Sequence, residues 1–259
     1  MRKYIDDLSV VENIRLQPNY FLLKLTQKEK LPPVLPGQFA QVRVDNSKHT
    51  FLRRPISIHN VDKYNNELWL LIQIVGEGTA QLSQLKQGQT VNLIFPLGNH
   101  FTIPRPAISS KRLLLVGGGA GVAPLFFLGT QLKDSGFIPV FLFGARSSDD
   151  LLQLNEFKNI SEIHISTEDG SIGEKGFPTQ HSLWKDCQFG MIYTCGPLPM
   201  MQAVATLANQ HGINWEESSA SSMVFPCDAI LFSMQVATNH SSSLLMITVP
   251  LKFIIYSNH

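Results

Sequence analysis

Residues 112–124 read RLLLVGGGAGVAP, and this stretch decides the fold that we expect for the chain. Its first five residues, Arg112 to Val116, form an apolar run of strand length, and the segment from Ala123 to Leu132 follows as a helix. Five small residues between a buried strand and a helix favour close approach of a ligand to the backbone. The spacing is not that of the G-x-G-x-x-G dinucleotide fingerprint, so a purely structural glycine turn stays open as the alternative.

The same order of strand, turn and helix recurs from about residue 111 to 210. Apolar runs at residues 140–143, 163–165 and 191–194 are of strand length, and residues 199–210 form the last helix of this part. Strands that alternate with helices indicate a parallel sheet with helices on both of its faces. We therefore expect an α/β domain over residues 105–215.

The part that precedes it, residues 1–104, differs because short strands and turns follow one another with little helix. Runs of strand length that alternate or are apolar occur at residues 21–25, 39–44, 68–75 and 90–94. This pattern predicts a small antiparallel β barrel. The expected fold class is thus a β barrel followed by an α/β parallel-sheet domain. For the first part, an all-β module that binds no cofactor is the alternative.

The bulk properties of the 259 residues exclude several classes of protein. A formal net charge of +1 provides no field that attracts nucleic acid or an anionic membrane. No run reaches the roughly 18 apolar residues of a membrane span, and the start lacks the apolar core of a signal peptide. We expect a cytoplasmic protein with neither nucleic acid nor membrane as partner. Cys187, Cys195 and Cys227 are too few and too scattered for a disulfide framework.

Residues 54–57, Arg-Pro-Ile-Ser, end a strand that we expect to begin near Thr50. The guanidinium of Arg54 offers forked donors that match the oxygens of a pyrophosphate. An apolar residue and a serine on the same strand can add a flat neighbour for a flavin ring and a donor close to its N5 atom. The alternative is an edge strand whose arginine is solvated, because short motifs often match by chance.

Residues 76–79, Gly-Glu-Gly-Thr, follow the expected strand 68–75 and open a helical stretch at residues 80–85. The glycines let the backbone approach a phosphate, and Thr79 is a good N-cap residue. The amides at the start of such a helix form an anion site. A plain capped helix is the alternative, but an arginine and a helix start in the same barrel favour a pyrophosphate.

Two further residues lie at the carboxyl edge of the expected parallel sheet, where ligands bind in open α/β folds. Cys195 ends a late strand and precedes a Gly-Pro turn, so its thiol would face the crevice; a small buried core cysteine is the alternative. Arg146 follows the strand at residues 140–143, and it either meets an adenosine phosphate or caps a helix. The choice between NADH and NADPH stays open, because no acidic residue is clearly placed for a ribose.

These motifs, in this order and at these separations, resemble the ferredoxin–NADP reductase superfamily, in which a flavin barrel precedes a nicotinamide domain. Within it, residues 1 to about 215 are most similar to the electron-transfer subunits of NAD-dependent dihydroorotate dehydrogenases. The resemblance is carried by LRRPISI at residues 52–58, VGEGT at 75–79, PLGN at 96–99, residues 116–124 and YTCGP at 193–197.

The resemblance implies an FAD-dependent NADH oxidoreductase subunit. Members of the family pass electrons through FAD and a [2Fe-2S] cluster, between NADH and the FMN of a catalytic subunit. That partner oxidises dihydroorotate to orotate in pyrimidine synthesis, and a heterotetramer is the expected assembly. Because the cofactors carry the chemistry, no catalytic acid or base is assigned. The residues implied to bind the cofactors are Arg54, Pro55, Ile56, Ser57, Leu71, Ile72, Gln73, Gly78, Thr79, Gly118, Gly119, Gly121 and Cys195.

The family's cluster does not fit the end of this chain. Residues 216–259 contain nine serines and only Cys227 as a thiolate source, whereas a [2Fe-2S] cluster needs four ligands. We hypothesise that the sequence from about Trp215 onward is a shifted reading frame or a degenerate end, and a lineage that discarded its cluster is the competing idea. The alternative function is an NAD(P)H-dependent flavin reductase subunit of another redox complex, or a non-functional variant without the cluster.

Overall fold

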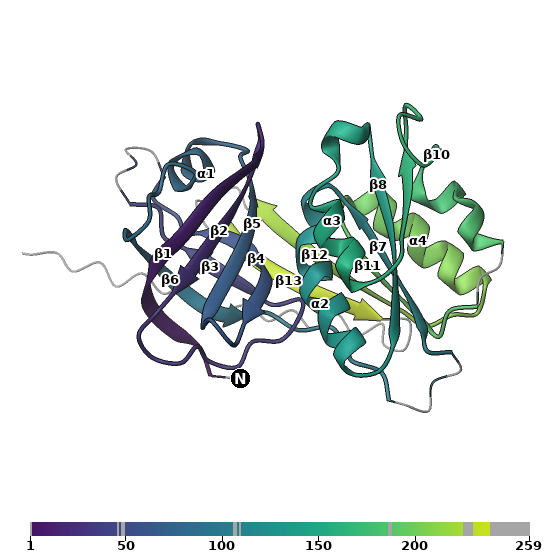
Figure 1. Ribbon diagram of the computed structural model, residues 1–259, viewed down its shortest axis with the longest axis horizontal. Coiled ribbons are helices and arrows are strands. Elements are labelled where there is room, and N and C mark those ends of the chain that lie inside the picture. The colour runs from purple at the N-terminus through teal and green to yellow at the C-terminus, as the bar shows by residue number, and fades with distance from the viewer. Residues whose placement is uncertain are drawn as a thin grey trace, which may run out of the picture.

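The computed structural model describes residues 2–45, 47, 50–105, 108, 110–185, 188–224 and 230–238, with side chains described as far as residue 218. A closed β barrel forms one half, and a largely parallel sheet with helices on both faces forms the other, as Figure 1 shows. The fold class predicted from the sequence is confirmed. Cys187 and Cys227 lie outside the described residues. In the part of the chain that is described, no helix is both long and apolar enough to cross a membrane.

The barrel closes in the order β1-β2-β5-β4-β3-β6, with antiparallel pairing between neighbours. Apolar side chains of its strands, such as Leu23, Ile58 and Leu70, meet inside and are fully buried. The sequence does not reveal β1, because charged and polar residues interrupt its apolar ones. The elements are β1 (Tyr4–Gln17), β2 (Tyr20–Thr26), β3 (Phe39–Val42), β4 (Arg54–Asp62), β5 (Glu67–Gln73), α1 (Glu77–Leu82) and β6 (Thr90–Leu97).

Two local expectations in the barrel are wrong. Residues 54–57 begin β4 instead of ending a strand, because they pair with β3 from Arg54 opposite Val42 onward. Helix α1 begins at Glu77 with Gly76 as its N-cap, so Thr79 is not the cap. The cause is the Thr79 hydroxyl, which accepts the N–H of Val75 at 2.9 Å and donates to the carbonyl of Gly76 at 3.0 Å. This local bonding orders the turn and starts the helix earlier.

The sheet of the second half has the order β10-β9-β8-β7-β11-β12-β13, parallel from β10 to β12 and antiparallel between β12 and β13. Alternate side chains of the central strand β7 face opposite layers. Leu113 and Leu115 belong to the cluster with α2 and α3, whereas Leu114 and Val116 belong to the cluster with α4. The elements are β7 (Arg112–Gly118), α2 (Val122–Asp134), β8 (Ile138–Ala145), α3 (Leu154–Ile160), β9 (Ile163–Thr167), β10 (Glu174–Lys175), β11 (Met191–Cys195), α4 (Leu198–Gln210), β12 (Trp215–Val224) and β13 (Ile230–Thr238).

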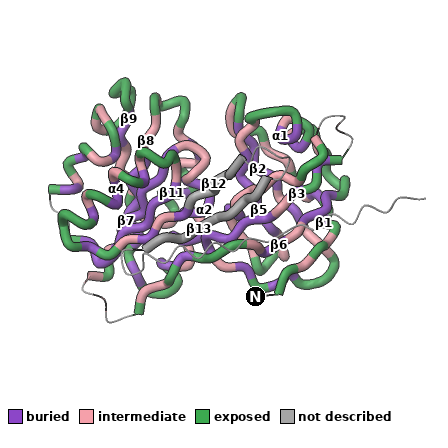
Figure 2. The backbone as a smooth tube through the Cα atoms, turned by 180° about the vertical axis from the view of Figure 1, so that it is seen from behind, coloured by how far each residue is buried: buried purple, intermediate pink, exposed green. Residues whose placement is uncertain are grey.

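The barrel and the sheet are joined by a shared hydrophobic layer. Leu22 and Leu71 of the barrel belong to the same buried cluster as Leu125 of helix α2, and α2 lies against β4. Figure 2 shows buried backbone in the strands of both halves. The Nε2 of Gln17 also donates to the carbonyl of Leu151 at 2.9 Å across the same junction. Packing and hydrogen bonds therefore fix how the two halves face each other.

The composition changes at residue 216, but the sheet continues beyond it. Strand β12 pairs in parallel with β11, from Trp215 opposite Ile192 to Ser218 opposite Cys195. Glu216 is 3% exposed, and its Oε2 accepts the N–H of Thr102 at 2.8 Å. Figure 1 shows β12 and β13 between the barrel and the rest of the sheet. The expected boundary after residue 215 thus falls inside a strand. Residues 225–229 and 239–259 lie outside the described residues.

Glu216 provides a pH-dependent test of how β12 is docked. Burial raises the pKa of its carboxyl above the ordinary 4.5, although the hydrogen bond from Thr102 and the charge of His100 oppose the shift. When the folded-state pKa exceeds the unfolded one, the group contributes stability at low pH and loses it as the pH rises through the folded pKa. Glu216→Gln keeps an oxygen for Thr102 and cannot ionise. The free energy of unfolding of this variant should therefore increase relative to that of the wild type as the pH rises from about 4 to about 7.

Urea unfolding of both proteins at several pH values measures this difference. Glu156→Gln, a change of an exposed glutamate on α3, serves as the control and should keep the pH profile of the wild type. Parallel profiles for Glu216→Gln and the wild type would contradict a buried Glu216 and the docking of β12.

Candidate functional site

A cavity of about 1050 Å³ lies between the barrel and the sheet. Strands β4 and β5 line it on the barrel side, and the turn after β7 and the loop after β11 line it on the other. Of the site residues expected from the sequence, Gly78 does not line the cavity. Those that do are Arg54, Pro55, Ile56, Ser57, Leu71, Ile72, Gln73, Thr79, Gly118, Gly119, Gly121 and Cys195. Residues far apart in the sequence are therefore brought to the same space.

Two neighbouring arginines at the start of β4 make different contacts. The Nη1 of Arg53 donates to the carbonyls of Gln41 at 3.3 Å and Asn92 at 3.0 Å, so this side chain is bonded to the barrel. Arg54 lines the cavity, and its Nε is buried with no hydrogen-bond partner among the described residues. A buried donor without a partner costs about 1–3 kcal/mol. Arg54 is therefore suited to an acceptor that comes from outside the chain.

Gly78 acts on the cavity through Arg54. A Cβ at this position would lie 3.3 Å from the Cδ of Arg54 and 2.9 Å from the Cγ2 of Thr50. The missing side chain therefore leaves room for the stem of Arg54 beside α1. Thr79 does line the cavity, but its hydroxyl accepts the N–H groups of Val75 and Gly76 and donates to the carbonyl of Gly76, so its contribution is an ordered turn.

The glycine turn after β7 is pressed against the loop after β11. A Cβ on Gly121 would lie 2.3 Å from the carbonyl oxygen of Cys195, and one on Gly118 would lie 2.9 Å from a methionine sulfur of α4. Gly119 differs, because its φ is +54° and a Cβ there would meet only the hydroxyl of Tyr20, at 3.8 Å. Packing thus explains Gly118 and Gly121, while Gly119 leaves the cavity open. A structural role for the glycines, which the sequence left open as the alternative to ligand binding, therefore applies to Gly118 and Gly121.

The sequence left open whether Cys195 faces the crevice or is a buried core cysteine, and the structure shows both properties. Cys195 lines the cavity, and it also belongs to the buried cluster around β7 and α2 with an exposed fraction of 7%. Burial raises the pKa of its thiol to about 12, and the charge of Glu217 adds to the shift. At neutral pH the thiol is therefore uncharged, which suits a side chain that packs against a ligand better than a nucleophile.

The sequence patterns do not point to two residues that line the same cavity. Tyr20 reaches it from β2; burial raises the pKa of its hydroxyl, as does Asp150, whereas Arg146 lowers it. Ser218 is fully buried beside Cys195, and its Oγ has no hydrogen-bond partner among the described residues. For Tyr20, the available signal in the sequence was a tyrosine at the start of an apolar strand. Ser218 lies beyond the change in composition, where no pattern marks it.

Charged residues also line the cavity. Arg146 follows β8 and Glu168 follows β9, and both side chains border the cavity together with Asp150. The short helix after Arg146, at Ser148–Asp150, has no side-chain capping bond. The structure therefore places Arg146 at the cavity, as one of its two sequence interpretations required.

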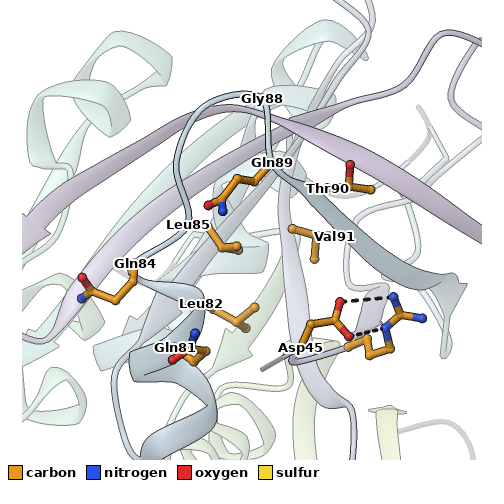
Figure 3. Close-up of a pocket in the computed structure, with 10 residues that line it drawn as sticks. Asp45, Gln81, Leu82, Gln84, Leu85, Gly88, Gln89, Thr90 and Val91 are labelled. Atoms are coloured by element: carbon orange, nitrogen blue, oxygen red, sulfur yellow. Dashed lines mark hydrogen bonds and ion pairs between the residues drawn. The ribbon is translucent and has the colours of Figure 1, made fainter. Parts of the chain in front are cut away.

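A second hollow, of about 360 Å³, lies on the barrel beside α1 and β6 (Figure 3). Arg43 and Asp45 form an ion pair at its rim, with 2.7 Å between Nε and Oδ1. The remaining lining residues, which are uncharged, are Gln81, Leu82, Gln84, Leu85, Gly88, Gln89, Thr90 and Val91. None of the residues expected to bind a cofactor lines it. Because its cation is already paired, this hollow offers little to a charged ligand.

Comparison with known proteins gives the same picture. Residues 115–206 match the model of the oxidoreductase NAD-binding domain. The chain is 40% identical over 200 residues to the electron transfer subunit of dihydroorotate dehydrogenase B (NAD(+)) of Lysinibacillus sphaericus, covering 77% of each protein. The subunit of Fusobacterium nucleatum is 33% identical over 212 residues, with 80% of this chain and 82% of the relative covered. The chain belongs to the family of electron transfer subunits of dihydroorotate dehydrogenase B (NAD(+)).

Membership in this family makes the chain an oxidoreductase, and the resemblance stated from its motifs is confirmed. Among solved structures, the NADH-dependent reduced ferredoxin-NADP oxidoreductase is 25% identical, with a TM-score of 0.72 over 85% of this chain and 78% of the other. A ferredoxin reductase of carbazole 1,9a-dioxygenase shares the fold, with a TM-score of 0.68 over 82% of this chain and 67% of the other, at 20% identity. The family of the chain and its NAD-binding domain support NADH-linked electron transfer.

Gly121→Ala tests the close approach between the glycine turn after β7 and the loop after β11. The added Cβ would meet backbone atoms of Cys195 and Gly196, which cannot rotate away as a side chain can. We expect a loss of about 1–3 kcal/mol in the free energy of unfolding, measured in urea. Gly76→Ala is the matched control, because nothing lies within 4 Å of its Cβ and its extended φ of −177° suits any residue. Since Gly76 is the N-cap of α1, this change should cost less than about 1 kcal/mol. Equal stability of both variants would contradict the contact.

Proposed function

We propose that the chain is an electron-transfer flavoprotein subunit. It moves electrons between NADH and, through FAD, the FMN of a dihydroorotate dehydrogenase catalytic subunit in pyrimidine biosynthesis. The observation that carries this proposal is the cavity, because a wall with Arg54 and Ser57 from the barrel stands opposite a glycine turn and Cys195. Hydride transfer between two cofactors requires such a shared space, with the reacting atoms about 3–3.5 Å apart.

FAD suits the barrel side of the cavity. The unpartnered Nε of Arg54 would donate to its pyrophosphate, and Gly78 keeps space for that arginine. When bound, FAD supplies hydride chemistry that no side chain of the protein has. The remaining residues assigned to it, which border the cavity from β4, β5 and α1, are Pro55, Ile56, Ser57, Leu71, Ile72, Gln73 and Thr79.

NAD(H) suits the α/β side, and the match of residues 115–206 to an NAD-binding domain supports this assignment. Gly118, Gly119 and Gly121 line this side of the cavity, and Gly119 would let the protein backbone approach NAD(H) closely. The uncharged thiol of Cys195 would pack beside the reacting ring. We assign residues 1–104 to the FAD-binding domain and residues 105–215 to the NAD-binding domain. We assign residues 216–259 to the atypical tail, of which residues 216–224 and 230–238 continue the sheet as β12 and β13.

A [2Fe-2S] cluster does not fit this chain. The 259 residues contain three cysteines, and the cluster of this family needs four thiolates. Cys195 lines the cavity, which leaves still fewer. Among the described residues, no group of three or more His, Cys, Asp or Glu side chains could hold a metal ion. We therefore assign no step to a cluster, and we expect electron delivery to the partner to be much weaker than NADH oxidation with an artificial acceptor.

The partner proposed for the chain is the FMN-containing dihydroorotate dehydrogenase catalytic subunit, in a heterotetramer. The names of the relatives support this partner, because each is an electron transfer subunit of such an enzyme. The missing cluster cysteines favour a second candidate, an NAD(P)H-dependent flavin reductase subunit of another redox complex. The two candidates differ in the protein that accepts the electrons.

Arg54→Ala should weaken FAD binding by about 10- to 100-fold, because a charge-assisted hydrogen bond of about 1.5–3 kcal/mol is lost. Titration of the flavin-free protein with FAD, followed by flavin fluorescence, measures this change. Arg53→Ala is the matched control: it removes the neighbouring arginine, whose Nη1 is bonded to the barrel carbonyls of Gln41 and Asn92. We expect it to lower the free energy of unfolding and to leave FAD affinity nearly unchanged. Undiminished FAD affinity in Arg54→Ala would rule out the assigned anchor.

The partner is tested by co-expression of the chain with a tagged dihydroorotate dehydrogenase catalytic subunit from the same source. The proposal predicts that the two co-purify, with the mass of a heterotetramer in light scattering. It also predicts that NADH oxidation with ferricyanide far exceeds NAD⁺ reduction by dihydroorotate. If the catalytic subunit purifies alone while the chain still oxidises NADH, the second candidate function is correct.

A further inference from the structure

His59 is a buried polar side chain at the junction of the two halves, and it belongs to neither set of cofactor residues. It lies on β4, two residues after Ser57, and is fully buried. Its Nδ1 lies 2.8 Å from the carbonyl oxygen of Ala123, in the first turn of α2. Because a carbonyl only accepts, Nδ1 carries the proton and donates it, which fixes the tautomer of the ring.

The surroundings of the ring keep it neutral. Burial lowers the pKa of His59 to about 4, although the bond to Ala123 and the neighbouring Gln153 side chain oppose the shift. The ring also packs against Phe126 of α2, with 4.8 Å between centroids. Its Nε2 and the Oε1 of Gln153 are buried, and neither makes a hydrogen bond of normal geometry to a described residue, although Gln153 lies close enough to raise the pKa of the ring. The bond from Nδ1 to Ala123 is thus the polar contact that ties this ring to α2.

A short series of contacts connects this bond to both sides of the cavity. Strand β4 carries Ser57 on the barrel side, and Ala123 itself lines the cavity on the other. Two residues before Ala123, Gly121 lies against the backbone of Cys195, so near that a Cβ would come within 2.3 Å of its carbonyl oxygen. A shift of the first turn of α2 would therefore move the glycine turn and Cys195 relative to Ser57.

We propose that His59 is a positioning residue, whose hydrogen bond to Ala123 sets the separation between the flavin strand β4 and the nicotinamide-binding turn. This inference rests on the proposed function, because it assigns His59 to the same hydride transfer. His59 touches neither cofactor in this account and acts through the first turn of α2. Misplacement of reacting atoms by about 1 Å can slow a reaction about 100-fold, so a single bond at this junction has a large effect on rate.

Three variants separate the hydrogen bond from the bulk of the side chain. His59→Asn can place an amide N–H where Nδ1 stands, His59→Phe keeps a ring without a donor, and His59→Gln places its amide farther out. Flavin reduction by saturating NADH is followed in an anaerobic stopped-flow instrument, together with FAD content and the NADH dissociation constant. We expect His59→Phe and His59→Gln to be about 10- to 100-fold slower with both binding constants nearly unchanged. His59→Asn should keep most of the rate.

Two further readouts distinguish positioning from a merely structural role. Long-wavelength charge-transfer absorbance arises only when the nicotinamide and flavin rings are stacked, and it should fade in the Phe and Gln variants. Amide hydrogen exchange in the first turn of α2 should also be faster in these two variants than in the wild type, since local opening becomes easier without the bond. This second readout requires no cofactor.

The outcomes that would overturn the proposal are a wild-type rate in His59→Phe, or a loss in His59→Asn as large as that in His59→Phe. Loss of the fold in all three variants would also overturn it, because His59 would then be a determinant of folding. A wild-type chain that binds FAD but is not reduced by NADH would refute the proposed function instead. In that case hydrogen exchange still decides whether the bond to Ala123 holds α2 in place.

Discussion

The packing of helix α2 against strand β4 is the contact on which the candidate site depends. It brings a barrel strand that starts with Arg54 next to a helix that starts at a glycine turn, and the cavity is the space left between them. Phe127 of α2 belongs to the same buried apolar cluster as Ile58 of β4, so burial contributes to the strength of the contact. Without this contact, each half would retain a groove for one cofactor, but no space where two could meet.

The course of the backbone determines what each half of the molecule contributes to the cavity. Strand β4 alternates its side chains between the barrel interior and its surface, so Ile58 enters the core while its neighbours reach the cavity or α2. On the other side, the glycines bring the turn after β7 and the loop after β11 close together. The barrel thus supplies a cation and apolar surface, and the α/β half supplies an approachable backbone. Neither half carries a group that must act as an acid or a base for hydride transfer.

Much of this arrangement could be predicted because it depends on local patterns. The apolar run at residues 112–116 and the small residues after it predict β7 and its turn, and Pro36 to Gln38 marks a turn in the barrel. Strand β1 was hidden, since its partners in the barrel and not its own residues make it a strand. The start of α1 was misplaced, because the Thr79 hydroxyl bonds backward instead of capping.

What could not be predicted depends on contacts between distant residues. Tyr20 and Ser218 border the cavity only because the start of β2 and the middle of β12 lie beside it. Ser218 and Glu216 also bear on the origin of the tail. Their burial and the pairing of β12 with β11 indicate that the residues just after Trp215 fit this sheet. A shift of reading frame at about Trp215 would have to preserve this pairing by chance.

The central claim is that one cavity holds a flavin and a nicotinamide within reach of each other. The most direct measurement is the visible absorbance of the purified chain with bound FAD, recorded without oxygen while NADH is added. The account predicts flavin bands that bleach in proportion to the NADH added, until each flavin has received one hydride. A protein that stays colourless with excess FAD, or a bound flavin whose bands NADH leaves unchanged, would contradict it.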